Sequence, residues 1–176
     1  MTANGNGNYY GKYRGTVINN IDPLGLGRLM VEVPDALGLV PSSWAVPCTP
    51  LAGPSGPPMG VYMVPPIGAG VWVEFEQGDP NYPVWVGCRW GAVTDVPPLV
   101  KLGLPVSPSI VMQTLAQNSI SISDLPGPTG GIMLKSTTGA MIIVNDLGIT
   151  IQNGKGASIT MVGPAVTVNA GALIVT

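Results

Sequence analysis

The acidic residues are the first groups in this sequence to consider for chemistry, because the chain contains no histidine. Without histidine, Ser-His-Asp and Cys-His nucleophilic schemes and most catalytic zinc sites are excluded. Glu74 and Glu76 are two residues apart and could form an acid/base pair on one face of a strand. Their alternation with Val73 and Phe75 is better explained by a half-buried strand whose polar side faces water. We therefore expect no catalytic site, no metal site and no cofactor.

Two glycine-rich segments, 25–27 and 68–70, have the composition of phosphate-binding loops. Neither opens a helical pattern, so the helix dipole and amides that bind phosphate are missing, and a turn or bulge is the better interpretation. The four tryptophans suggest a stacking platform for single-stranded nucleic acid. However, Trp72 and Trp85 alternate with apolar neighbours, and no basic cluster accompanies them. We expect them in a core or a subunit interface, and nucleic acid is not an expected partner.

The N-terminus, the cysteines and the uncharged segments indicate in which cellular compartment the chain is expected to assemble. The N-terminus lacks the pattern of a signal peptide, so we expect assembly in the bacterial cytoplasm. In that compartment reduced, buried thiols are favoured over a disulfide for Cys48 and Cys88. The stretches 36–73 and 156–176 carry no charge. Prolines, glycines and β-branched residues interrupt them, so no stable membrane insertion is expected.

The low charge of the chain indicates an obligate oligomer. Only 9% of the residues are charged and 45% are hydrophobic, whereas an ordinary soluble domain carries about 25% charged residues. A monomer of this composition would expose large apolar patches. The 25 glycines and 19 prolines argue for short strands joined by tight turns, and the expected fold class is all-β.

A small barrel is expected in residues 9–95, after a flexible N-terminal tail at 1–8. Apolar alternation and turn signals predict four of its five strands at 9–18, 28–33, 43–46 and 83–90. The remaining strand, fourth in chain order, is expected from 61–64 and 69–76 together, with a kinked entry at residues 65–68. Five short strands with one long loop are typical of a closed Greek-key barrel such as an OB-fold. The barrel would position Glu74, Trp72 and Trp85.

A different pattern follows a Pro-rich linker at 96–118. From residue 119, short alternating strands recur with glycine or asparagine in nearly every gap. One chain of this length cannot bury their apolar faces, whereas three chains winding around one axis can. We predict an intertwined triple-stranded β-helix at 119–176, a homotrimeric needle. The residues expected on its axis are Ile120, Ile122, Ile132, Leu134, Ile142, Val144, Ile149, Ile151, Ile159, Met161, Val166 and Val168.

A monomeric parallel β-helix is the alternative for this segment. Such a helix needs about 20 residues or more per coil, so residues 119–176 would supply roughly two or three coils. The trimer is the preferred interpretation because it also removes open sheet edges.

Two segments carry a resemblance to a known family. The first reads P-I-G-A-G-V-W-V-E-F-E-Q-G-D-P at 66–80 and Y-P-V-W-V-G at 82–87. The second reads Y-G-K-Y-R-G-T-V at 10–17 and G-R-L-M-V-E-V at 27–33. Together they resemble the barrel of the phage baseplate assembly protein V and valine-glycine-repeat spike family of contractile injection systems. The resemblance implies a homotrimeric spike on the axis of a tail tube.

The sequence departs from the family pattern in two ways, and each implies a separate partner protein. The chain is too short for the large hub domain of many members, so a separate hub or baseplate protein is expected at the barrel end. Self-tipped spikes chelate a metal through histidines, which this sequence lacks. A separate tip protein of the proline-alanine-alanine-arginine (PAAR) class is therefore expected at the C-terminal end. Its predicted interface is the apolar last strand, Ala172, Leu173, Ile174, Val175 and Thr176.

The function expected from these observations is structural. The chain would be the central spike of a phage tail or a phage-derived injection particle, would link hub to tip, and would pierce a target envelope when the sheath contracts. An OB-fold protein that binds nucleic acid or carbohydrate, with a repetitive β tail, is the alternative. A β-helical polysaccharide-degrading enzyme is disfavoured, because the repeat region holds only Asp124 and Asp146 as acids.

Overall fold

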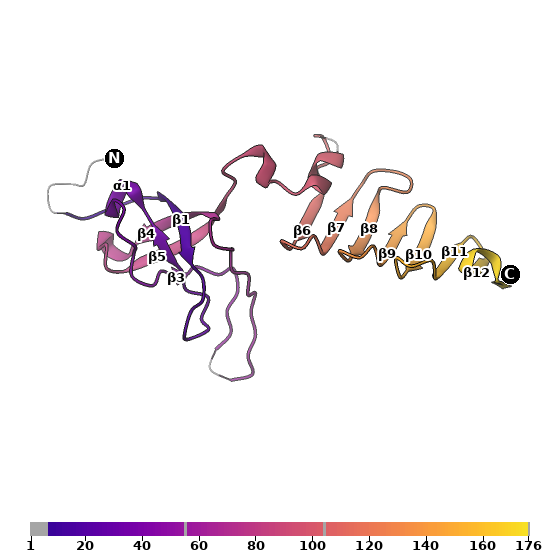
Figure 1. Ribbon diagram of the computed structural model, residues 1–176, viewed down its shortest axis with the longest axis horizontal. Helices are drawn as coiled ribbons and strands as arrows, with labels where there is room; N and C mark the ends of the chain where they lie inside the picture. Colours follow the sequence, from indigo (N-terminus) through magenta and orange to yellow (C-terminus); the bar gives the residue numbers. More distant parts are fainter. Residues whose placement is uncertain (1–6, 55, 104, 176) are drawn as a thin grey trace. The chain divides into compact units, whose positions relative to one another are not determined.

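The computed structural model describes residues 7–54, 56–103 and 105–175, without the side chains of residues 171, 174 and 175. Residues 1–6 of the predicted tail therefore lie outside the described residues. The described residues form two compact units, a first unit that ends at Asp95 and a second unit that begins at Val96. Each unit has its own β-sheet (Figure 1), and the prediction of an all-β fold is confirmed.

The first unit is a curled sheet, whose described residues form five strands in the order β2-β1-β4-β5-β3. Strand β3 pairs in parallel with β5, and the other pairs are antiparallel. Its elements are β1 (Tyr13–Asn19), β2 (Met30–Glu32), α1 (Pro34–Leu37), β3 (Val46–Pro47), β4 (Gly70–Phe75), η1 (Glu76–Gly78), β5 (Pro83–Arg89) and η2 (Val93–Asp95).

The core of the first unit lies against one face of this sheet. Along β4, buried and half-buried positions alternate, as expected for a strand with one face on a core. The fully buried side chains are Val17, Leu29, Val31, Val33, Val71 and Val73. Tyr9, Tyr13 and Phe75 close one end of the core with ring centroids 5.6 to 5.9 Å apart. Burial of each such aliphatic side chain stabilises the unit by roughly 1.5–3 kcal/mol.

The prediction of a fourth strand from 61–64 and 69–76, with a kinked entry, is only partly correct. Within that range β4 covers 70–75, and residues 61–64 are not a strand. Pro65 and Pro66 lack the amide hydrogens that a continuous ladder would need, so the strand cannot extend through them. The described residues from 48 to 63 are instead exposed and contain one isolated bridge, between Ala52 and Gly60.

The second unit is an antiparallel meander, and in its described residues eight strands follow one another from β6 to β13. Each strand pairs with its neighbours in the same chain. Its elements are η3 (Pro98–Leu102), β6 (Ile110–Gln113), β7 (Ser119–Ser123), β8 (Gly131–Lys135), β9 (Met141–Asn145), β10 (Gly148–Gln152), β11 (Ser158–Val162), β12 (Ala165–Val168), η4 (Asn169–Gly171) and β13 (Leu173–Val175).

The stretch expected to be a linker, 96–118, contains η3 and the first strand of this meander. Its prolines lie outside β6, which therefore keeps its backbone hydrogens for pairing with β7. The second sheet thus begins before residue 119.

Glycines in the turns let neighbouring hairpins approach closely. Gly148 has φ 139°, and a Cβ built there would lie 2.0 Å from the carbonyl oxygen of Met161. Gly131 has φ 84°, and its Cβ would lie 2.1 Å from the carbonyl oxygen of Val144. Any larger residue at either position would collide with the backbone of the neighbouring strand. This explains the glycines at these two positions.

Candidate interaction surface

The apolar side chains of the second sheet form two continuous files on one face. Directly paired residues of neighbouring strands share a face, as do residues two apart on one strand. File A contains Ile110, Ile122, Ile132, Val144, Ile149, Met161 and Val166. File B contains Met112, Ile120, Leu134, Ile142, Ile151, Ile159, Val168 and Leu173. The twelve residues predicted for a trimer axis all lie in these two files.

Much of this face is open to solvent in the single chain. Eight of the twelve predicted residues are exposed, from 39% at Ile151 and Ile159 to 50% at Ile132. The other four, Ile149, Met161, Val166 and Val168, are half-buried. A contiguous apolar surface of this kind is typical of an interface with another protein chain.

Three further residues extend the files and were not among the twelve predicted for the trimer axis. Ile110 and Met112 on β6 are 65% and 54% exposed, and Leu173 on β13 is 57% exposed. The alternation of Ile110 and Met112 was present in the sequence. The surrounding prolines favoured a linker interpretation, so this signal was missed.

The opposite face of the second sheet has a different character. Its central file runs through Ser121, Met133, Ile143, Thr150, Thr160 and Thr167. Ser121 is 8% exposed, and the remaining members are half-buried. Leu99 and Leu102 of η3 line a small pocket together with Ser121 and Met133. The two faces thus differ in polarity, and the apolar files are on the more exposed one.

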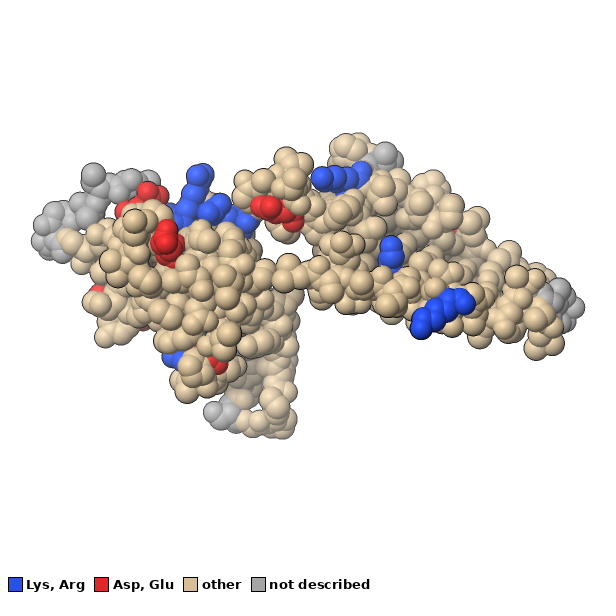
Figure 2. Space-filling view, viewed as in Figure 1, with Lys and Arg blue, Asp and Glu red and all other residues tan. Residues whose placement is uncertain are grey.

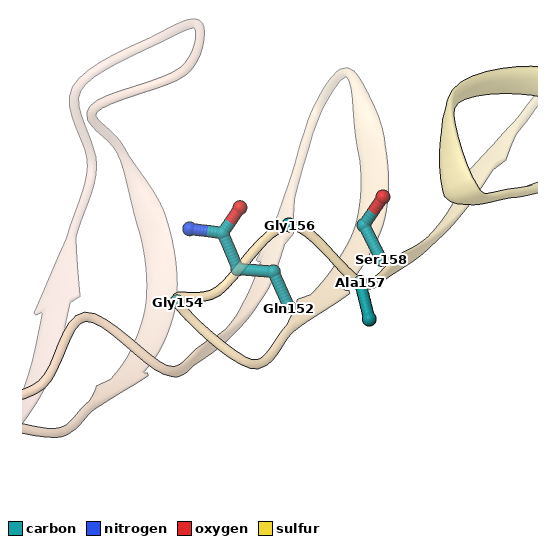
Figure 3. Close-up of a pocket in the computed structure, with 5 residues that line it drawn as sticks. All are labelled: Gln152, Gly154, Gly156, Ala157 and Ser158. Atoms are coloured by element: carbon teal, nitrogen blue, oxygen red, sulfur yellow. The ribbon is translucent and has the colours of Figure 1, made fainter.

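A shallow pocket lies at the β10–β11 turn of the second unit. It is lined by Gln152, Gly154, Gly156, Ala157 and Ser158. Figure 3 shows the polar ends of Gln152 and Ser158 on the same side of the turn and Ala157 pointing away. None of these side chains titrates or acts as a nucleophile activated by a neighbouring base. The residues that line this pocket therefore include no general acid, general base or activated nucleophile.

Glu74 and Glu76 lie in different elements and have different surroundings. Glu74 on β4 forms an ion pair with Lys12, whereas Glu76 begins η1 after the strand has ended. Across residues 7–54, 56–103 and 105–175, no three acidic or cysteine side chains gather as a candidate metal site. The arrangement favours the structural interpretation of both glutamates.

The four tryptophans do not share a surface. Trp85 is 7% exposed in the core, and its Nε1–H donates to the carbonyl oxygen of Gly27 at 3.1 Å. Trp72 lies on the other face of the sheet beneath Arg14, whose guanidinium carbon is 6.0 Å from the ring centroid. Trp44 lies under Arg28 at 5.4 Å, and Trp90 is 64% exposed. Because the rings are distributed in this way, they do not form a stacking platform.

The two glycine-rich segments lie in turns. Gly25 and Gly27 have positive φ angles in the loop between β1 and β2. Asp22 organises this loop, since its carboxylate accepts hydrogen bonds from the amides of Leu24 and Leu26 and pairs with Arg28 at 2.6 Å. The guanidinium of Arg28 holds the pKa of Asp22 well below its usual range. Gly68 likewise has a positive φ, in the turn that precedes β4.

The cysteines are free and exposed. The prediction of buried thiols is therefore wrong. Cys88 lies near the end of β5, opposite Val71, and partial desolvation raises the pKa of its thiol.

The C-terminal strand β13 is an edge of the second sheet. Its backbone pairs with β12 in the register Leu173 with Val168 and Val175 with Val166, and β13 is last in the strand order. Ala172 and Leu173 are exposed. Of the predicted tip interface, Thr176 and the side chains of Ile174 and Val175 lie outside the described residues. In the described part of the chain, no helix has the length and apolar character needed to cross a membrane.

Charged side chains are sparse on both units. Figure 2 shows wide uncharged areas on the visible face of each unit. Arg28 and Lys12 are engaged with acidic partners. Recognition by these surfaces must therefore depend mainly on apolar contact and backbone hydrogen bonds.

Comparison with known proteins assigns each unit to a described family. Residues 13–90 match the family described as the Type VI secretion system/phage-baseplate injector OB domain. Residues 109–174 match the phage baseplate V C-terminal trimerisation domain. Among curated proteins, none matches the chain. The first match coincides with the curled sheet, and the second coincides with the meander that carries the two files.

Proposed function

Because the chain belongs to the phage baseplate V family of spike-type proteins, we propose that it is the central spike of a contractile injection apparatus. The family assignment makes it a structural component of a phage baseplate or Type VI spike, with a trimerisation domain. In the proposed role, the spike joins a separate hub protein to a tip protein and pierces the target envelope when the sheath contracts.

The observation that carries this proposal is the pair of apolar files on one face of the second sheet. Three copies that turn these faces toward a common axis would bury Ile120, Ile132, Ile142 and Ile151 together with the rest of both files. Since every inner strand already has backbone partners on both sides, side-chain packing would join the copies. A continuous ladder with tight glycine turns would supply the stiffness that penetration requires.

The two ends of the spike have different proposed partners. The first unit would meet the hub or baseplate protein. At the other end, β13 offers an unextended sheet edge and the exposed side chain of Leu173. A cone-shaped PAAR-class protein could continue the ladder there by strand addition. The spike would assemble in the bacterial cytoplasm and become part of a phage tail or a phage-derived particle.

Solution mass tests the proposal most directly. Light scattering of the full chain should give about three times its mass of 18.0 kDa. A monomer at micromolar concentration would rule out the trimeric spike. Electron microscopy of injection particles with a labelled copy should then place the label on the tube axis, and a label on the sheath or the fibres would contradict the central position.

A further inference from the structure

Residues 48–63 of the first unit, called the arm below, form a long excursion from the sheet (Figure 1). The described part of the arm folds into a two-stranded ribbon. The amide of Gly53 donates to the carbonyl of Met59 at 2.6 Å, and the amide of Val61 donates to the carbonyl of Leu51 at 3.0 Å. The arm therefore has a defined backbone although it contributes nothing to the buried core.

The side chains of the arm are uncharged and largely apolar, as is typical of a surface that contacts another protein. The arm contains no charged residue, and each of its described residues is exposed. Its exposed apolar side chains are Leu51, Met59, Val61, Tyr62 and Met63, between 37% and 69% exposed. The ring of Tyr62 lies close to Gly27 of its own chain, but most of this uncharged apolar ribbon is in water, which is unfavourable unless another surface covers it.

A second uncharged apolar surface lies on the same unit, in the loop 19–27 between β1 and β2. Ile21, Leu24 and Leu26 are 76%, 66% and 59% exposed there. The only charged group of the loop is Asp22, whose side chain is 2% exposed and is neutralised by Arg28. Because Asp22 also binds the amides of Leu24 and Leu26, the loop presents its apolar side chains in a fixed arrangement.

We propose that the arm of one copy packs against the 19–27 loop of a neighbouring copy. The proposal rests on the trimer of the proposed function. In that trimer the arm would be a clasp, that is, a contact that holds the first units of two copies together. A contact between two different patches closes into a ring when it is repeated around a threefold axis. Both surfaces are electrically neutral, so packing them together would desolvate no unpaired charge.

The trimerisation domain is the reason to expect that the surface covering the arm belongs to a second copy of this chain. It lies in the same polypeptide and would tether three arms and three loops together. Tethering of this kind gives effective concentrations that reach the millimolar range for short flexible connections. A contact too weak to form between free monomers would therefore form within the trimer.

A photo-crosslinking amino acid in place of Met59 tests the proposal in the full chain without any partner protein. Irradiation should produce covalent dimers and trimers, with the crosslink on residues 19–27 of another copy. The same probe in place of Leu39, which is 81% exposed outside both surfaces, should leave monomers on a denaturing gel. A Met59 crosslink confined to its own chain, located elsewhere on the neighbour, or formed only after a hub protein is added overturns the clasp.

Hydrogen exchange supplies a second, energetic test. The variants Met59→Ser/Met63→Ser in the arm and Leu24→Ser/Leu26→Ser in the loop should each speed exchange at Val61. A roughly tenfold change is expected, as the loss of about one buried apolar side chain would produce. Combining the two pairs should add little, because both remove the same contact. The control Leu39→Ser should leave exchange unchanged.

The outcomes separate this inference from the proposed function. A monomeric mass would defeat both. A trimer in which loop variants leave exchange at Val61 unchanged would overturn the clasp alone and leave the spike intact.

Discussion

Ile151 on β10 lies directly opposite Ile159 on β11, and each side chain is 39% exposed on the same face of the second sheet. The strands that carry them are joined by a turn in which Asn153 Oδ1 accepts the amides of Lys155 and Ala157 at 2.8 and 3.1 Å. The turn therefore sets the register that brings the two isoleucines together. This pair lies in file B, midway along the surface proposed to meet the trimer axis.

The first prediction concerns this pair. Ile151→Asp or Ile159→Asp should abolish the trimer, because three carboxylates would be brought together on a dry axis. An unpaired buried charge costs about several kcal/mol, and symmetry repeats this cost in each copy. Light scattering should show the mass falling from about three chains to one chain of 18.0 kDa.

Two control variants test whether the effect belongs to the apolar face. Thr150→Asp adds the same charge next to Ile151 on the opposite face, and Lys155→Ala changes an exposed turn residue. Both should remain trimeric. If Ile151→Asp stays trimeric with an unchanged melting temperature, the files do not face the axis.

The second prediction concerns the close approach at Gly148. Gly148→Ala should lower stability by about 2 kcal/mol or more, since both the positive φ and the carbonyl of Met161 oppose a Cβ. Gly156→Ala is the matched control, because Gly156 also has a positive φ but faces open space. Thermal unfolding of both variants should show the larger loss of Tm at Gly148. Equal losses would mean that backbone conformation alone explains the glycine.

The third prediction is a pH dependence that arises from Asp22. The pKa of this carboxyl is depressed in the folded chain, mainly by its hydrogen bonds with Arg28. A depressed pKa stabilises the fold above the carboxyl's unfolded value of about 3.9, and this stabilisation is lost as pH falls toward the folded value. Asp22→Asn should therefore reduce stability at pH 7, and the difference from the unsubstituted chain should narrow below about pH 4.

Denaturant unfolding at a series of pH values measures this difference. Asp35→Asn, a substitution at an exposed position of α1, is the control and should change stability little at any pH. A gap between Asp22→Asn and the unsubstituted chain that stays constant from pH 7 to pH 3 would exclude the ionised carboxylate as its cause.

The fourth prediction tests the C-terminal edge. Deletion of residues 171–176 should leave a trimer, because β6 to β12 still carry most of both files. The deletion should abolish binding of a PAAR-class tip protein in a pull-down, since β13 and its edge are removed. A truncated trimer that still binds the tip protein would place the interface elsewhere.

Part of this surface was predictable from local sequence. Alternation at pairs such as Ile120/Ile122 and Ile142/Val144 is enough to put both members on one side of a strand, because side chains in a strand alternate with period two. Turn residues between the pairs predicted the hairpins. These local rules put the two members of each predicted axis pair on one side of their own strand.

Other features depended on pairing between strands. Proline content made 96–118 resemble a linker, yet Ile110 and Met112 extend the files because β6 finds a partner in β7. In the first unit, 61–64 has strand-like residues but is followed by Pro65 and Pro66, which cannot continue a ladder. The exposure of Cys48 and Cys88 was also not predictable from local sequence.

The sequence by itself determined the all-β class, the two-part organisation of its patterns and the alternation that gives each late strand an apolar side, since these are set by neighbours along the chain. Only the tertiary structure decided that these apolar sides line up as two unbroken files. It also decided that most of the arm remains uncovered and that Asp22, paired with Arg28, orders the 19–27 loop. The physical reason is that register and burial depend on residues distant in sequence, and a slip of one residue in any hairpin would send its apolar side chains to the other face.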